Sequence, residues 1–302
     1  MDQAAVTEPV AKQALDSSAM AAVVSVNGLR KSYGEFEALK GVGFELRAGE
    51  VFGLLGPNGA GKTTTIEILE GYRPRDGGEV EVLGADPATA GLDWRARIGV
   101  VLQSSAMYEN LTVAESLDQF AGYYERPRPT DEVIALIGLE EKRDDRVRRL
   151  SGGQRRRLDL GLALIGDPEL IFLDEPTTGF DPGARRRAWE TIRSLSALGK
   201  TILLTTHYLD EVEQLADRVA VLREGRIVAA GTVQELTQST PATEIRYREN
   251  GREVVVRTEE PTRVLHELTA RALEHGDELP GLEVRRPSLE EVYLSLTQEQ
   301  DE

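Results

Sequence analysis

The sequence predicts an α/β fold around a mainly parallel sheet, with a helical insertion and a small α+β unit at its C-terminal end. Three observations predict this arrangement. Strand-like apolar runs alternate with helical patterns between residues 23 and 238. Residues 104–150 lack β-branched runs and show helical patterns. The composition shifts after about Thr237, where the segment "QSTPAT" is typical of a linker.

The bulk composition narrows the class of protein. The 302 residues carry a net charge of −16, which argues against a basic nucleic-acid-binding surface. There is no cysteine, so disulfides and thiolate metal sites are excluded. No apolar run reaches the roughly 18–20 residues that span a bilayer. Residues 1–22 lack the apolar stretch of a signal peptide, and we expect a disordered tail there.

The elements follow one another in a consistent order. Strands are expected at 23–29, 44–56, 79–83, 97–103, 170–175, 201–207 and 219–231, with a helix opening at 62. The C-terminal unit, 239–302, predicts a hairpin turning at Asn250-Gly251, a helix over 261–276, a strand at 282–286 and a last helix with a Ser288–Glu291 capping box.

A glycine-rich loop follows the strand "VFGLL" and opens the first helix. The segment "GPNGAGKT" comprises Gly56, Pro57, Asn58, Gly59, Ala60, Gly61, Lys62 and Thr63 and matches the phosphate-loop pattern. Backbone N–H groups of such a loop surround phosphate, helped by the helix N-terminus. We expect Lys62 to reach the β- and γ-phosphates and Thr63 to hold Mg²⁺, with Thr64 extending the helix start.

Two adjacent carboxylates end the apolar strand "LIFLDE". A nucleotide site needs one carboxylate near the metal and one to polarise water. Because neighbouring strand residues point to opposite faces, Asp174 and Glu175 cannot share one role. We assign Asp174 to the metal and Glu175 to the attacking water.

A second anion site is expected at "RLSGGQRRRL". Ser151 and Gln154 form a capping box, so a helix begins here with free N–H groups. Gly152 and Gly153 leave its approach free of side chains. The site has no lysine and no metal ligand, so it can complete a nucleotide site built elsewhere.

Together, "GPNGAGKT", "LSGGQ" and "LIFLDEP" resemble the nucleotide-binding subunits of ATP-binding cassette (ABC) proteins over about residues 23–238. The resemblance implies a P-loop NTPase (RecA-like) core, an antiparallel β subdomain and a helical subdomain at about 104–156. It also implies a head-to-tail homodimer, in which the "LSGGQ" segment of one subunit closes on the ATP of the other.

The same resemblance assigns four further positions. Gln103 is similar to the Q-loop glutamine, which contacts Mg²⁺ and water, and His207 to the switch histidine on the γ-phosphate. Asp181 in "TTGFDP" resembles the D-loop aspartate at the dimer interface, although Phe180 replaces the usual leucine. Tyr33 resembles the aromatic residue that stacks on adenine.

The implied reaction is hydrolysis of the β–γ bond of ATP by in-line attack of water. The expected catalytic residues are Glu175, His207, Lys62 and Gln103, and the expected Mg²⁺ residues are Thr63, Gln103 and Asp174. The ATP-binding set contains the phosphate loop with Thr64, Tyr33, Gln103, Ser151, Gly152, Gly153, Gln154, Asp174, Asp181 and His207.

The tail "RPSLEEVYLSLT" is similar to that of ABC-2-type exporter ATPases, including the daunorubicin/doxorubicin-resistance group. The resemblance implies a separate integral-membrane permease, bound through the helical subdomain at the cytoplasmic face of the membrane. Hydrophobic drugs are a candidate cargo, and no nucleic-acid partner is expected. A soluble cassette ATPase of translation or DNA repair, or an importer subunit, remains the alternative.

Two other features have ordinary structural interpretations. Arg155, Arg156 and Arg157 are expected to form the solvated polar face of their helix, as charge runs usually do. Trp189 is expected in the core, and His266 and His275 are expected to be structural.

Overall fold

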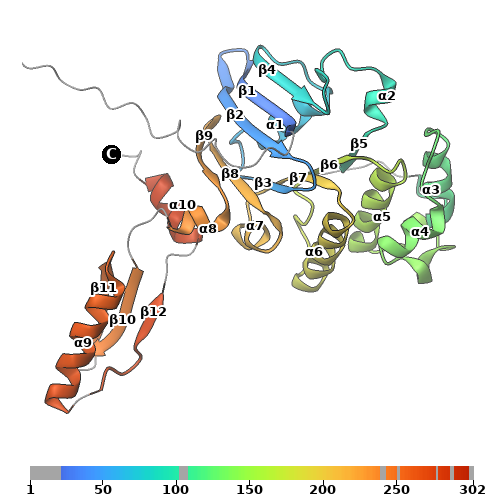
Figure 1. Cartoon of the computed structure of the whole chain (residues 1–302). Helices are drawn as coiled ribbons and strands as arrows, with labels where there is room; N and C mark the ends of the chain where they lie inside the picture. The colour runs from blue at the N-terminus through green and yellow to red at the C-terminus, as the bar shows by residue number, and fades with distance from the viewer. Residues whose placement is uncertain are drawn as a thin grey trace, which may run out of the picture.

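A computed structural model describes residues 22–101, 108–238, 243–249, 252–276, 278–285 and 289–298. Within these ranges the chain forms three sheets and helices on their flanks (Figure 1). The expected tail up to residue 21, Gln103, the Asn250-Gly251 turn and Ser288 all lie outside the described residues.

The strands are β1 (Ala22–Tyr33), β2 (Phe36–Arg47), β3 (Val51–Leu55), β4 (Gly77–Val82), β5 (Ile98–Val101), β6 (Leu170–Asp174), β7 (Thr201–Thr206), β8 (Arg218–Arg223), β9 (Arg226–Gly231), β10 (Thr243–Glu249), β11 (Arg252–Thr258) and β12 (Glu283–Arg285). The helices are α1 (Lys62–Leu69), α2 (Leu92–Arg95), α3 (Val113–Ala121), α4 (Thr130–Leu136), η2 (Glu140–Lys142), η3 (Val147–Arg149), α5 (Gly152–Leu164), α6 (Pro182–Ala197), α7 (Leu209–Leu215), α8 (Val233–Gln238), α9 (Pro261–His275) and α10 (Leu289–Gln298). Within the described ranges, none of these helices combines the length and apolarity needed to cross a bilayer.

The main sheet has the order β5-β6-β7-β3-β8-β9, in which only β9 is antiparallel to its neighbour. Strands β3, β6 and β7 are buried along their whole length, as the continuous apolar runs predict. Their carboxyl ends carry the phosphate loop, the carboxylate pair and His207. The parallel α/β core is therefore confirmed, and it gathers three separate motifs at one edge.

A second, antiparallel sheet of order β2-β1-β4 packs over α1 and the core strands. It shares one apolar cluster with the main sheet, including the stacked rings of Phe44 and Phe52 at 5.2 Å. On the other side of the molecule, α3, α4 and α5 share a cluster with β6 and β7 (Figure 1). The antiparallel subdomain and helical insertion agree with the predicted fold class.

The C-terminal part forms a three-stranded antiparallel sheet of order β11-β10-β12, with α9 beside it (Figure 1). The predicted helix over 261–276 is observed as α9, which ends at His275 and is followed by Gly276 in the left-handed conformation. The last helix, α10, returns to the main body, because Leu289 and Val292 are buried in a cluster with Val212 of α7 and Leu236 of α8. The final helix therefore packs against the part of the chain that carries the main sheet.

This packing predicts that Leu289→Ala lowers the free energy of unfolding by about 2–4 kcal/mol, because it opens a cavity at a fully buried side chain. Leu294 lies on the same helix and is 45% exposed, so Leu294→Ala serves as the matched control with a much smaller effect. Urea titrations of both variants measure the difference. Equal stability of the two variants would show that α10 does not pack as described.

Candidate active site

Two glycines fix the loop between β3 and α1. A Cβ atom on Gly56 would lie 2.3 Å from the carbonyl oxygen of Leu222. Gly61 has a φ of 109°, and its Cβ atom would lie 2.6 Å from Leu39. Between them the loop exposes Pro57, Asn58 and Gly59 and buries Ala60. The close approach of the backbone to its surroundings therefore requires glycine at both ends of the loop.

Lys62 places a buried ammonium group inside this loop. Its Nζ donates to the carbonyl oxygens of Gly56 at 2.8 Å and Pro57 at 3.1 Å, and lies 3.2 Å from Oε1 of Glu175. The side chain is only 4% exposed. A buried ammonium group whose partners are oxygen atoms can exchange these partners for the oxygen atoms of an anion that enters the loop.

Asp174 is held between two hydroxyl groups. The Oγ1 of Thr63 donates to Oδ2 at 3.0 Å, and the Oγ1 of Thr205 donates to Oδ1 at 2.5 Å. The Thr205 hydroxyl also accepts from the backbone N–H of Glu175 at 3.0 Å. The structure thus joins the two residues expected at the metal, a hydroxyl and a carboxylate of the kind that Mg²⁺ prefers. The contacts of Thr205 with Asp174 and Glu175 were not predicted from the sequence.

Glu175 leaves the strand with a φ of 47°, an uncommon value for a residue other than glycine. Its carboxylate contacts Lys62, accepts from the Thr178 hydroxyl at 3.1 Å and lies 3.5 Å from Nδ1 of His207. Burial acts to raise the pKa of Glu175, but the hydrogen bonds and charges of these neighbours outweigh it and hold the pKa below its ordinary value. The carboxylates of Asp174 and Glu175 therefore have different side-chain partners, although Thr205 contacts both residues.

His207 follows β7 and faces Glu175. Its Nδ1 is buried and has no hydrogen-bond partner among the residues that the structure describes. The imidazole ring lies 4.1 Å from that of Tyr208, centroid to centroid. A buried nitrogen without a partner, beside a carboxylate, can hydrogen-bond a ligand oxygen or water.

Tyr33, at the end of β1, is 41% exposed and therefore accessible to a planar ligand. Its hydroxyl lies 3.3 Å from Oγ1 of Thr64, and the Arg73 guanidinium lies 5.2 Å from its ring centroid. These contacts place the first hairpin beside the start of α1. Gln103, the remaining residue of the expected set, falls outside the described residues.

The second anion site lies at the start of α5. Ser151 Oγ accepts from the N–H of Gln154 at 3.3 Å, and the Gln154 side chain accepts from the N–H of Ser151 at 2.8 Å, which confirms the capping box. A Cβ on Gly152 would meet nothing within 4 Å, and one on Gly153 would lie an ordinary 3.6 Å from Ala184. Packing among the described residues therefore does not explain the glycine pair.

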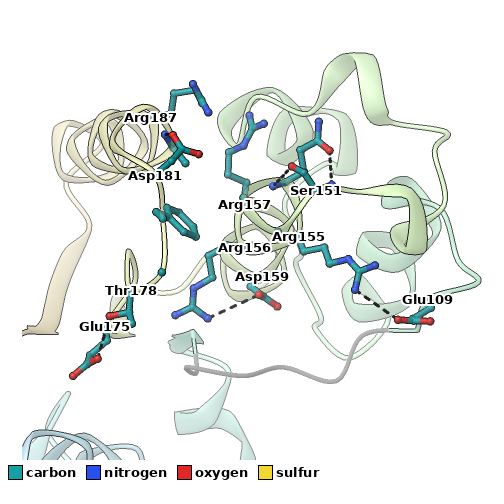
Figure 2. Close-up of a pocket in the computed structure, with 16 residues that line it drawn as sticks. Glu109, Ser151, Arg155, Arg156, Arg157, Asp159, Glu175, Thr178, Asp181 and Arg187 are labelled. Atoms are coloured by element: carbon teal, nitrogen blue, oxygen red, sulfur yellow. Dashed lines mark hydrogen bonds and ion pairs between the residues drawn. The ribbon is translucent and has the colours of Figure 1, made fainter. Parts of the chain in front are cut away.

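An open cleft of about 1120 Å³ separates this helix start from the Glu175–Asp181 loop (Figure 2). Asp181 caps α6 by accepting from the N–H of Ala184 at 2.9 Å. This bond is the main reason that the pKa of Asp181 falls below its ordinary value. Ser151 and Glu175 both line the cleft, from opposite elements.

The expectation of a solvated arginine face is wrong for Arg156 and Arg157. The Arg156 side chain is 14% exposed and donates to the carbonyl oxygens of Asp174 and Pro176. Arg157 donates to the carbonyl oxygen of Ile137 at the end of α4. Carbonyl groups at the ends of helices and strands need donors, and the guanidinium groups supply them. Sequence charge alone does not reveal these partners.

Glu211 of α7 carries a buried carboxylate that was also not predicted from the sequence. Its Oε1 accepts from the Thr177 hydroxyl at 2.9 Å and from the Trp189 indole N–H at 3.2 Å. Burial raises its pKa, although the Thr206, Thr177 and Trp189 hydrogen bonds act against that shift. Trp189 is partly buried against the core, as expected, and Glu211 links α6, α7 and the loop after Glu175.

Glu70, directly after α1, predicts a pH-dependent stability. Burial, followed by the charges of Asp174 and Glu67, raises its pKa from 4.5 to about 8. Because the folded pKa exceeds the unfolded one, stability is lost as the pH rises between these values. Glu70→Gln removes this loss, so its stability relative to wild type should increase from about pH 5 to about pH 8.5. Denaturant titrations without nucleotide measure it, with the exposed Glu81→Gln as control. A pH-independent difference would contradict the assignment.

Comparison with known proteins gives consistent matches. The ABC transporter family model matches residues 39–178, and a model described as the C-terminal domain of ABC transporter domain-containing protein-like proteins matches residues 231–288. A solved structure titled as the ATP-binding subunit of an ABC transporter aligns with a TM-score of 0.68 at 25% identity, covering 91% of this chain and 100% of that chain. A cassette solved as a dimer with ADP and Pi aligns with a TM-score of 0.62 at 25% identity, over 69% and 98%.

Three curated relatives match over almost their full length. The chain is 39% identical to the Nod factor export ATP-binding protein I of Ralstonia nicotianae, covering 91% of this chain and 94% of that protein. It is 37% identical to the daunorubicin resistance ATP-binding protein DrrA3 of Streptomyces coeruleorubidus, over 91% and 95%. It is 34% identical to the linearmycin resistance ATP-binding protein LnrL of Bacillus subtilis, over 91% and 98%.

Proposed function

The chain belongs to the ATP-binding subunits of the ABC transporters, and we propose that it hydrolyses MgATP to drive export through a separate ABC-2-type membrane permease. The printed names of the relatives concern Nod factor export and resistance to daunorubicin and linearmycin. Export of hydrophobic organic compounds, including drugs, is the corresponding function for this chain. In this proposal the chain works at the cytoplasmic face of the membrane and is held there by its permease.

The residues at the edge of the main sheet fit MgATP. Lys62 is a buried ammonium group inside a phosphate loop, and Thr63 and Asp174 are joined at 3.0 Å. The Nδ1 of His207, which has no hydrogen-bond partner in the part of the chain that the structure describes, lies 3.5 Å from Glu175 in the same region. Bound MgATP supplies the phosphoryl group that is transferred, and its magnesium offsets phosphate charge.

The chain's own groups then have distinct tasks. Lys62 and the loop N–H groups bind the phosphates, and Thr63 and Asp174 hold the metal. Glu175 accepts a proton from the attacking water while His207 orients it, with Gln103 assigned to the same shell by family resemblance. Tyr33 supplies a ring for the adenine. Catalysis here is mainly positioning and electrostatic stabilisation.

One observation supports the dimeric form of this function: among the described residues nothing lies within 4 Å of a Cβ on Gly152, and one on Gly153 would make only an ordinary 3.6 Å contact with Ala184. Glycine at a helix start lowers helix stability unless something must approach the backbone. In a head-to-tail dimer, the phosphates held by the partner's loop approach Ser151, Gly152 and Gly153, where the N–H groups of the first helical turn and the helix dipole attract anions.

Co-expression with the membrane protein encoded by the neighbouring gene tests the export function. If that gene encodes a six-helix ABC-2-type protein, we expect this chain to be retained in the membrane fraction and its ATPase rate to respond to the permease. Lys62→Ala should abolish efflux without releasing the chain from the membrane. A neighbouring second cassette or solute-binding protein would instead contradict export.

A further inference from the structure

Three consecutive arginines follow the capping box of α5 and have three different sets of partners. Arg155 donates to the carbonyl oxygen of Arg148 at 3.2 Å and lies 3.6 Å from Glu109. Arg157 reaches back to the end of α4. Among the described residues, Arg156 is the one of the three that donates to peptide groups beside Glu175. It also lies 3.9 Å from Asp159 of its own helix (Figure 2). The three side chains therefore differ in their contacts although they are identical in type.

The contacts of Arg156 lie on both sides of Glu175. Its Nη2 donates to the carbonyl oxygen of Asp174 at 3.1 Å, and its Nε lies 3.4 Å from that of Pro176. A charged donor in a mostly buried position makes stronger hydrogen bonds than a neutral one. The guanidinium therefore fixes the two peptide groups that enclose the Glu175 residue.

Glu175 needs such support because its backbone has a φ of 47°. Thr205 fixes its N–H and Thr178 contacts its carboxylate, but both residues belong to the core domain. Arg156 differs because it belongs to the helix that begins at Ser151. Arg156 therefore links α5 to the Glu175 backbone by hydrogen bonds.

The start of α5 is rigidly connected to Arg156. The reciprocal hydrogen bonds of Ser151 and Gln154 close the first turn, and the N–H of Arg155 donates to the carbonyl oxygen of Ser151 at 2.9 Å. Arg156 lies only five residues after Ser151, within about one and a half helical turns. The helix start, where an anion would bind, is thus linked to Arg156 through little more than one hydrogen-bonded helical turn.

We propose that Arg156 is a positioning residue that couples the two ATP sites of the dimer. Nucleotide held by the partner's phosphate loop contacts Ser151–Gly153 at the start of α5. Arg156 then positions the backbone on both sides of Glu175, which acts on the ATP bound by its own chain. The inference rests on the proposed dimeric function. It makes hydrolysis at one site depend on occupancy of the other.

The test compares Arg156→Gln, Arg156→Lys and the matched control Arg155→Gln in the full-length protein. ATPase rates are measured against MgATP concentration at a protein concentration that permits dimers, and binding of a fluorescent ATP analogue is measured separately. For wild type we expect a Hill coefficient between 1 and 2, the number of sites. Arg156→Gln should bring it to about 1 and lower kcat by about 10- to 100-fold, with analogue binding to the monomer unchanged.

Arg156→Lys can reach one of the two carbonyl groups, so it should recover part of kcat and of the cooperativity, and Arg155→Gln should resemble wild type. Wild-type kcat and Hill coefficient in Arg156→Gln would overturn the proposal, as would an equal loss in Arg155→Gln. If Arg156→Gln does not fold, Arg156→Lys decides: a wild-type Hill coefficient and kcat in that variant overturn the proposal. A wild-type Hill coefficient of 1 with full activity refutes only the coupling, whereas an inactive wild type refutes the proposed function.

Discussion

Glu175→Gln is expected to reduce ATP hydrolysis by about 10²–10⁴-fold while leaving MgATP bound, because an amide cannot accept the proton of the attacking water. Binding should not weaken. Lys62 lies 3.2 Å from Glu175, and a ligand phosphate has to compete with this carboxylate. The uncharged glutamine removes that competition, so the variant should bind MgATP at least as tightly as wild type.

The consequence is a trapped dimer. Two nucleotides that bind but are not hydrolysed keep two subunits associated, since opening follows hydrolysis in the proposed cycle. Size-exclusion chromatography with light scattering should show dimer with MgATP and monomer without it. Lys62→Ala serves as the control that binds ATP poorly and stays monomeric. A monomeric Glu175→Gln protein saturated with MgATP would contradict the shared-site arrangement.

The parts of the site that could be predicted from the sequence are those whose geometry depends on a few consecutive residues. The spacing of Gly56, Gly61 and Lys62 between a strand and a helix determines a local shape, and the Ser151–Gln154 box depends only on residues three apart. The buried strands β3, β6 and β7 were predictable because burial on both faces produces continuous apolar runs.

The residues that sequence missed act across the fold. Thr205 bridges Asp174 and Glu175 only because β6 and β7 are paired, and a threonine in a strand has no distinctive pattern. Arg156 belongs to a charge run that usually indicates solvent, yet the turn after β6 places carbonyl groups against it. The role of Glu211 likewise depends on its hydrogen bonds to residues of other elements. Tertiary contacts, rather than local propensity, define these positions.

A mixture of two inactive variants should recover activity if each site is made from two chains. Lys62→Ala disables the phosphate loop of its own chain. Gly152→Asp should fold, because a Cβ there meets nothing within 4 Å and an acidic residue is favourable in the first turn of a helix. The same carboxylate repels phosphate at the helix start, so it disables the site completed by that helix. Each variant alone should therefore hydrolyse ATP at least 10²-fold more slowly than wild type.

In the mixed dimer the two defects meet in one site and leave the other intact, since the Gly152→Asp chain supplies a normal Lys62 and the Lys62→Ala chain supplies a normal Gly152. Random pairing makes about half of the dimers mixed, so the mixture should reach at most about a quarter of the wild-type rate, and less if the sites are coupled. Lys62→Ala mixed with the double variant contains no normal phosphate loop and should stay inactive. A mixture of the single variants that remains as slow as its components, despite forming mixed dimers, would mean that each chain completes its own site. In that case the phosphate of a partner's nucleotide would not occupy the free space at Gly152.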